Sequence, residues 1–111
     1  TKALAYDERI KQILNTINNA NKWIGAICAA PFALEAAGVL KEGFTCYPSV
    51  EQEIATPGFL GDKSSVVITD NIITSRGPGT AMSFALAIVK QFEGIEAYET
   101  LKGGLLADDC K

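Results

Sequence analysis

One cysteine stands where its side chain could act as a nucleophile. Cys28 follows the short apolar run Trp23–Ile27, and the small residues Ala26 and Ala30 lie two positions to either side of it. The order small-x-nucleophile-x-small is typical of a nucleophile elbow, because the sharp turn from strand to helix needs small neighbours and lifts the central side chain above the sheet. A helix that begins just after the turn would aim N–H groups and its positive dipole end at the sulfur, which favours thiolate. The alternative is a buried structural cysteine.

Three further residues could belong to such a site. Arg76 lies in the glycine-rich turn Ser75–Gly79 ahead of a helix, where backbone N–H groups and a guanidinium can bind a carboxylate or phosphate. It could instead pair with an acidic residue and anchor the turn. Tyr47 could offer its hydroxyl to a small carbonyl compound or line the site with its ring. Cys46 is either a second redox-active thiol or a core residue.

Missing residue types exclude several kinds of chemistry. Because the chain has no histidine, it cannot by itself complete a Ser–His pair, a Cys–His pair or a His-ligated metal site. Its three cysteines, Cys28, Cys46 and Cys110, are an odd number without a CxxC pair. This pattern argues against a disulfide framework and for a reducing, cytoplasmic location.

Composition and charge describe one soluble domain. Apolar residues make up 48% and charged residues 21% of the 111 residues, which is ordinary for a globular protein of one core. The net charge is −3 and the basic residues are scattered, so no nucleic-acid partner is expected. No apolar stretch approaches the ~20 residues of a membrane span and no leader opens the chain, so we expect neither a membrane partner nor secretion. Glu35, Glu51 and Glu53 are expected at the surface.

The elements that must position these side chains alternate between helix and strand. Periodicity and turn residues predict, in order, a helix from Tyr6 to Ile17, a strand at Trp23–Ile27, a helix from Pro31 that stops at Gly38, a strand at Phe44–Tyr47, a hairpin of Ser65–Thr69 and Ile72–Ser75 that turns at Asp70–Asn71, and helices at Ala81–Phe92 and Ile95–Leu101. The segment from Ser49 to Lys63 is expected to be mostly loop. The helix Ala81–Phe92 is apolar on most of its circumference, which predicts deep burial.

The predicted sheet has too few strands for its most apolar member. A strand as apolar as Trp23–Ile27 is typical of a parallel sheet covered on both faces, with a hydrogen-bonded neighbour on each side. This chain offers too few parallel strands to supply those neighbours. We therefore expect further strands to come from another polypeptide segment.

The order of these motifs resembles the ThiJ/PfpI superfamily, and within it the Parkinson disease protein deglycase (DJ-1) group. The resemblance runs from about Asp7 to Gly94. It is carried by the segments Ile24–Pro31, Ala37–Lys41, Thr45–Pro48, Ile73–Thr80 and Phe84–Leu86. It implies an α/β fold, a flavodoxin-like three-layer α/β/α sandwich of the class I glutamine amidotransferase-like kind. Residues 1–111 would be the C-terminal part of a single domain whose N-terminal strands are missing from this chain.

The resemblance also implies a site. Cys28 would be the reactive cysteine, and Ala29, Tyr47, Arg76 and Pro78 would contact the substrate. The family's glutamate, which hydrogen-bonds the cysteine, and a Gly-Gly turn would lie in the N-terminal part of the same protein, possibly as a separate chain. A homodimer is expected as well.

The function implied is that of a glyoxalase or protein deglycase without metal or cofactor, acting on 2-oxoaldehydes such as methylglyoxal through a hemithioacetal on Cys28. Protease-like relatives have histidine after their cysteine, whereas this chain has Ala29, so peptidase activity is not expected. Tyr47 stands where many deglycase relatives have histidine. One alternative is an oxidative-stress redox sensor or chaperone that uses oxidation of Cys28 without turnover. Another is a structural fragment with no activity of its own.

Overall fold

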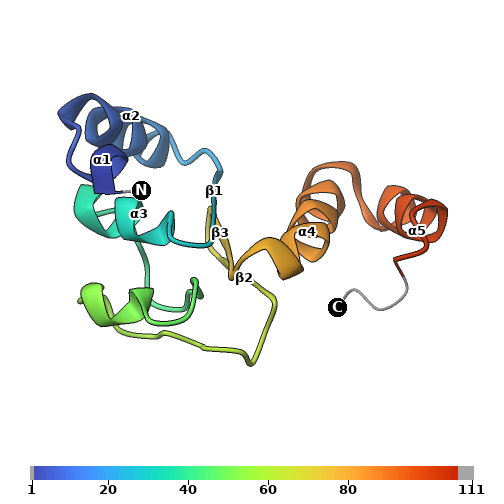
Figure 1. The fold of residues 1–111 in the computed structure, drawn as a ribbon. Coiled ribbons are helices and arrows are strands. Elements are labelled where there is room, and N and C mark those ends of the chain that lie inside the picture. The colour runs from blue at the N-terminus through green and yellow to red at the C-terminus, as the bar shows by residue number, and fades with distance from the viewer. Residues whose placement is uncertain (1, 108–111) are drawn as a thin grey trace.

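A small mixed sheet lies between two groups of helices in the computed structural model, which describes residues 2–107 (Figure 1). One face is covered by α1 (Lys2–Ala5), α2 (Glu8–Asn19) and α3 (Pro31–Ala37). The other face carries α4 (Ala81–Glu93), and α5 (Ile95–Gly104) packs against α4. The expected α/β/α layering is therefore present. Two short 3₁₀ turns, Val50–Glu53 and Pro78–Thr80, complete the elements.

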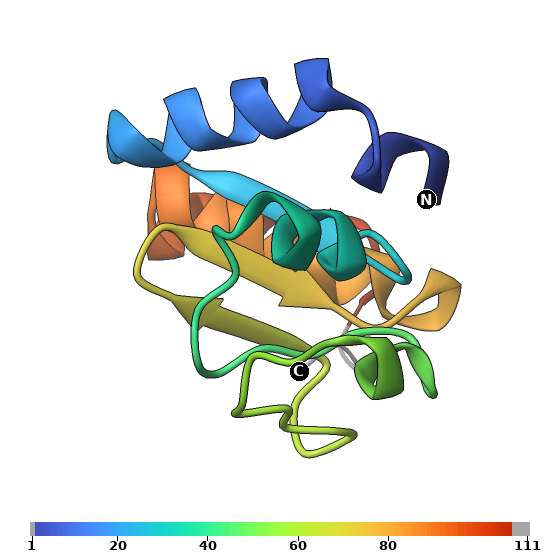
Figure 2. The same ribbon diagram turned by 90° about the vertical axis from the view of Figure 1, so that its left-hand side faces the viewer.

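The sheet contains one parallel and one antiparallel pair. Its order is β1 (Ile24–Ile27), β3 (Ile72–Ser75), β2 (Val66–Thr69), as Figure 2 shows. The predicted hairpin is confirmed, since β2 and β3 are antiparallel and connected through Asp70 and Asn71. β3 also runs parallel to β1, so the expectation that β1 would lack both neighbours is wrong on one side. Among the described residues the other edge of β1 carries no strand.

Alternating side chains explain how β1 is packed between the helical layers. Ile24 and Ala26 are buried in the core beside Leu34 of α3. Gly25 faces the opposite layer, where an added Cβ would lie 3.1 Å from the ring of Phe84 in α4. The absence of a side chain at Gly25 thus lets α4 approach the sheet closely.

The helix boundaries on the first face follow the predicted signals. Asp7 caps α2 by accepting a hydrogen bond from the Arg9 N–H at 2.8 Å. α3 begins at Pro31 and ends at Ala37. Gly38 follows as its C-cap with a left-handed φ of 76°, which glycine adopts without steric cost.

Two further predicted features are wrong. Phe44–Tyr47 is not a strand. The Thr45 N–H donates to the Thr74 side chain and the Tyr47 N–H donates to the Cys28 carbonyl, so neither takes part in a strand ladder. A single bridge from Phe44 to Phe59 remains.

The helix α4 is not deeply buried. Within α4, residues 81–93, only Leu86 is buried. Met82 and Phe92 are 46% and 56% exposed, because no described element covers the side of the helix that carries them.

The core lies between the sheet and the layer of α2 and α3. Its buried members come from β1, α3, β3 and the loop that follows α3: Ile24, Ala26, Leu34, Val39, Leu40, Phe44, Cys46, Ile54 and Ile72. No helix within residues 2–107 is both long and apolar enough to cross a membrane.

The loop from 42 to 60 depends on the absence of a side chain at Gly58. Gly58 has φ of 96°, and an added Cβ would lie 2.4 Å from the backbone nitrogen of Gly43. Gly38 also has a positive φ, but an added Cβ there has no neighbour within 4 Å. Because Gly38→Ala meets only backbone strain, we expect it to lower the free energy of unfolding by about 1 kcal/mol. Gly58→Ala should cost about 3 kcal/mol. Equal losses of unfolding free energy in the two variants, measured by urea denaturation of the folded protein, would contradict this explanation.

Candidate active site

Cys28 occupies a sharp turn with a backbone conformation that L residues seldom adopt. Its φ is 67°, in the left-handed region. Backbone hydrogen bonds hold it on both sides: its N–H donates to the Ser75 carbonyl at 3.0 Å, and its carbonyl accepts from the Tyr47 N–H at 2.8 Å. The side chain is half-buried. Strain of this kind persists only where the surrounding structure enforces it, and it is frequent at functional sites.

The N–H groups at the start of α3 are arranged differently from the expectation. Ala30, Phe32 and Ala33 each donate to the carbonyl three residues earlier, at 2.8–3.1 Å, and Pro31 has no N–H. These groups are therefore not free to bind the Cys28 sulfur. The N–H of Ala29 makes no backbone hydrogen bond within the described ranges. It is the donor beside the thiol that a ligand oxygen could use.

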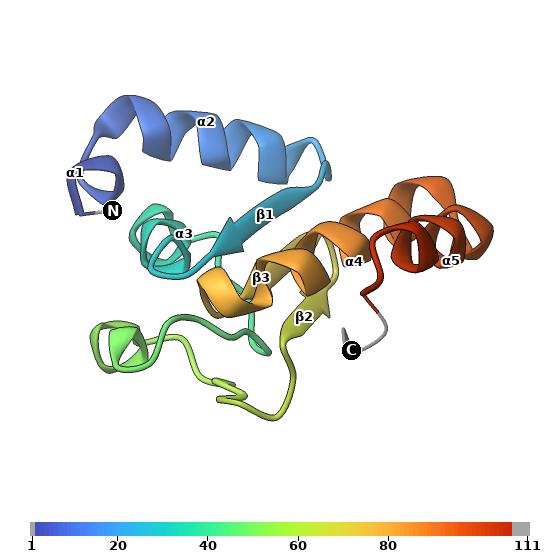
Figure 3. The ribbon, with the colours of Figure 1, turned by 45° about the vertical axis from the view of Figure 1, so that its right-hand side comes forward.

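Tyr47 lies between the Cys28 turn and the glycine-rich turn that follows β3. Its backbone is bonded to Cys28, and an added Cβ at Gly77 would lie 3.3 Å from Cδ2 of the Tyr47 ring. The ring therefore covers the Gly77 backbone, while the residue as a whole stays 48% exposed. The two turns meet at the end of the sheet where β1 and β3 both end (Figure 3).

Arg76 is anchored by a carbonyl and not by an acidic residue. Its Nε donates to the Cys46 carbonyl at 3.2 Å. No carboxylate lies within 4 Å of its guanidinium in the described part of the chain, so the predicted acidic partner is absent there. The bond through Nε orients the guanidinium, and its two terminal nitrogens make no hydrogen bond to residues 2–107. These nitrogens are suited to a carbonyl or carboxylate oxygen.

Thr80 shapes the turn that carries Arg76 and Pro78. Its Oγ1 lies 2.7 Å from the Ser75 hydroxyl and accepts from the N–H groups of Arg76 and Gly77 at 3.2 and 3.1 Å. Pro78 is exposed at the start of the 3₁₀ turn. Sequence reasoning did not identify Thr80. Its position three residues after Gly77, from which a side chain can reach back to the N–H of the N-cap residue as in a capping box, was the available signal.

Cys46 is buried next to this site, close enough to the Glu51 carboxylate to be influenced by its charge. Cys46 is 0% exposed, and burial, with the Glu51 carboxylate as second cause, raises the pKa of its thiol to about 11. The Arg76 guanidinium partly opposes this rise in the Cys46 pKa. The Glu51 Oε2 is buried and has no hydrogen-bond partner among the described residues, so the expectation that Glu51 is solvated is wrong.

Glu35 and Glu53, the other two glutamates expected at the surface, differ in their environments. Glu35 is not exposed as expected: its carboxylate accepts from the Ala55 N–H at 3.1 Å and the Thr56 hydroxyl at 2.5 Å, which ties α3 to the following loop. Glu53 is exposed and pairs with Lys2 at 3.1 Å.

Cys110 lies outside the described residues. Within residues 2–107 no group of three or more His, Cys, Asp or Glu side chains is placed to hold a metal ion.

The geometry brings Cys28, Ala29, Tyr47 and Arg76 to one end of the sheet. A compound with a carbonyl carbon near Cys28 Sγ would have three kinds of donor within the same region: a backbone N–H, a phenol and a guanidinium. Such an arrangement can support attack on a carbonyl and stabilise the oxyanion that results.

Comparison with known proteins matches this chain to one family over most of its length. The model of the DJ-1/PfpI family matches residues 1–91. A glutathione-independent glyoxalase of Caenorhabditis elegans, DJR-1.2, is 42% identical over 92 residues, which are 83% of this chain and 50% of the relative. The glutathione-independent glyoxalase DJ-1 of Schizosaccharomyces pombe is 33% identical over 101 residues, 90% of this chain and 53% of the relative.

Solved structures agree with this match. The crystal structure of Drosophila melanogaster DJ-1beta superposes with a TM-score of 0.87 at 36% identity, over 95% of this chain and 57% of that protein. The chain thus spans about half the length of the relatives it matches.

The different surroundings of the two described cysteines predict different reactivity. With a pKa of about 11, the Cys46 thiol is almost fully protonated at neutral pH, and its thiolate fraction rises only as pH approaches that value. We expect iodoacetamide at pH 7.5 to modify Cys28 first, and the rate at Cys46 to climb between pH 9 and 11. Peptide mapping by mass spectrometry reads each site separately, with Cys28→Ala as the control. Cys46 labelling as fast as Cys28 labelling at pH 7.5 would refute this assignment.

Proposed function

The chain belongs to the DJ-1/PfpI family, and we propose that it carries the nucleophile of a cofactor-independent glyoxalase, with Cys28 in that role. The observation that carries the proposal is the left-handed turn at Cys28, held by Ser75 and Tyr47. Two relatives in sequence are named glutathione-independent glyoxalases, which supports the same reaction class. A glyoxalase that needs no glutathione can use a thiol of its own, and the half-buried Cys28 thiol would take this role.

The proposed reaction converts a 2-oxoaldehyde such as methylglyoxal into a 2-hydroxy acid. The Cys28 thiolate attacks the aldehyde carbon, so a C–S bond forms while the C=O π bond breaks, and protonation of the oxygen yields a hemithioacetal. A base then moves the proton from this carbon to the neighbouring ketone carbon by way of an enediol. The aldehyde carbon is oxidised, the ketone carbon is reduced, and a thioester results. Water cleaves the thioester, releasing the acid and the thiol without an external oxidant or reductant.

Each remaining site residue receives a role from its position. The Ala29 N–H would donate to the oxygen that becomes negative during attack at Cys28. The terminal nitrogens of Arg76 would bind the second oxygen of the substrate, because Nε is already held by Cys46. Tyr47 would cover the substrate and offer its hydroxyl, and Pro78 would form part of the wall on the same turn as Arg76.

The base for the proton transfer would come from the rest of the domain. We propose that an N-terminal half, on the same or a separate chain, adds a strand to the free edge of β1 and brings the family's glutamate to Cys28. Two observations support this: the edge of β1 without a partner strand and the exposed apolar residues on α4. A homodimer and a cytoplasmic location stay predictions from the resemblance.

Turnover of methylglyoxal tests the proposed reaction. In the complete protein, Cys28→Ala should lower kcat by roughly 1,000-fold or more, because no other described thiol lies at the turn. Arg76→Lys should raise KM by about 10-fold, since an ammonium cannot keep the bond to Cys46 and also bind substrate in the same orientation. Lys63→Ala, an exposed lysine outside the site, is the control. Full activity of Cys28→Ala would overturn the proposal. So would absent turnover combined with uptake of one or two oxygens at Cys28 under mild peroxide, since it indicates a redox sensor.

The need for an N-terminal half has its own test. Residues 1–111 expressed alone should aggregate or unfold without a cooperative transition, because β1 exposes unpaired backbone groups beside apolar surface. Coexpression with the N-terminal half should give a soluble complex. Size-exclusion chromatography and thermal unfolding measure both, and a soluble monomer of residues 1–111 with a sharp transition would be the contrary result.

A further inference from the structure

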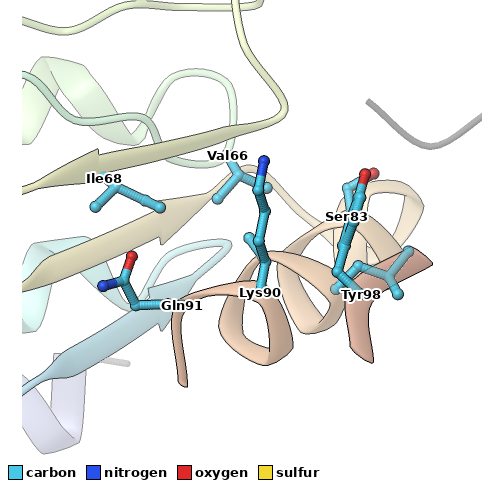
Figure 4. A pocket seen from close by; sticks show the side chains of 8 residues that line it. Val66, Ile68, Ser83, Lys90, Gln91 and Tyr98 are labelled. Atoms are coloured by element: carbon cyan, nitrogen blue, oxygen red, sulfur yellow. The ribbon is translucent and has the colours of Figure 1, made fainter. Parts of the chain in front are cut away.

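A groove of about 410 Å³ lies on the far side of the sheet from the β1 edge, between β2, α4 and α5 (Figure 4). Its floor consists of Val66 and Ile68 from β2 with Leu86 and Ala87 from α4. Val66 and Ile68 are two positions apart, so both side chains point from the same face of the strand. Ile68 is 46% exposed, which leaves an apolar surface open to water in this groove. None of these residues belongs to the Cys28 site.

The groove has a positively charged rim. Lys90 lines it, and its Nζ lies 5.2 Å from the centre of the Tyr98 ring, which also lines the groove. Lys102 places a second ammonium 5.6 Å from the centre of the same ring. Neither ammonium has a carboxylate within 4 Å in the part of the chain that the structure describes. Two cations thus share one aromatic ring without a contacting counter-charge, in a chain whose net charge is −3.

The combination of an apolar floor and an uncompensated positive rim defines the ligand that fits. The volume lies at the small end of the range for small-molecule sites. A neutral apolar compound would leave the two ammonium groups with the Tyr98 ring and water but no anionic partner, and a short polar anion would leave the floor exposed. An alkyl chain that ends in a carboxylate satisfies both surfaces.

We propose that this groove binds a medium-chain alkyl carboxylate. The alkyl chain lies over Val66, Ile68 and Leu86, and the carboxylate accepts a hydrogen bond from Lys90. Lys102 adds positive potential at the same end of the groove. The site is separate from the reaction at Cys28, so the proposal does not depend on the glyoxalase function.

Titration calorimetry with octanoate, 1-octanol and propionate separates the two parts of this recognition. The protein is the chain together with its N-terminal half. Octanoate should bind at least 10-fold more tightly than 1-octanol, which lacks the charge, or propionate, which lacks the chain. Lys90→Met keeps most of the apolar stem and removes the charge, so it should weaken octanoate binding by about 10-fold and leave 1-octanol binding unchanged. Lys63→Met is the matched control, because Lys63 is exposed and does not line the groove.

A change to the floor tests the apolar part. Ala87→Leu should fill part of the groove and weaken both octanoate and 1-octanol, with an unfolding midpoint that confirms a folded protein. If this variant fails to fold, the comparison of Lys90→Met with Lys63→Met still decides the matter. Equal affinities for octanoate and 1-octanol, equal effects of the two lysine variants, or no octanoate binding at millimolar concentration would each overturn the proposal. So would loss of octanoate binding in Arg76→Lys but not in Lys90→Met, because it would place the ligand at the Cys28 site.

Discussion

The parallel pairing of β1 with β3 is the constraint on which the candidate site depends. In this register Ile27 lies opposite Ser75, and the Cys28 N–H continues the ladder by donating to the Ser75 carbonyl. Because the strands are parallel, both leave the sheet at the same end, so Cys28 and Arg76 are neighbours although 48 positions separate them in the sequence. Ligands of open α/β sheets bind outside the carboxyl ends of the strands, which is where this pairing places the thiol and the guanidinium.

Side-chain hydroxyls decide the shape of the loop that completes the site. Thr74 accepts the Thr45 N–H, Thr45 donates to the Gly61 carbonyl, and Thr69 donates to the Gly43 carbonyl. Since buried backbone groups must be paired, these bonds take the place of a strand ladder and hold residues 43–47 against the end of the sheet. The result is that the Cys46 carbonyl meets Arg76 and the Tyr47 N–H meets Cys28.

The two faces of the sheet are unequal in how completely they are covered. The layer of α2 and α3 encloses a continuous core, whereas α4 leaves Met82 and Phe92 largely exposed and the outer edge of β1 carries no strand within residues 2–107. The chain spans about half the length of the relatives it matches.

Local signals in the sequence were sufficient for most elements and for the position of the nucleophile candidate. Asp7, Pro31 and Gly38 act within a few residues of themselves as caps and stops, and the Asp70–Asn71 turn joins adjacent strands, so neighbours along the chain decide these features. The small residues around Cys28 likewise indicated a sharp turn. Tertiary structure alone decided the pairing of β1 with β3, the loss of the strand at Phe44–Tyr47, the exposure of α4 and the partner of Arg76. Each of these features depends on which distant group satisfies a hydrogen bond or covers an apolar surface. Composition and periodicity do not identify that group, because they describe only residues close together in the sequence.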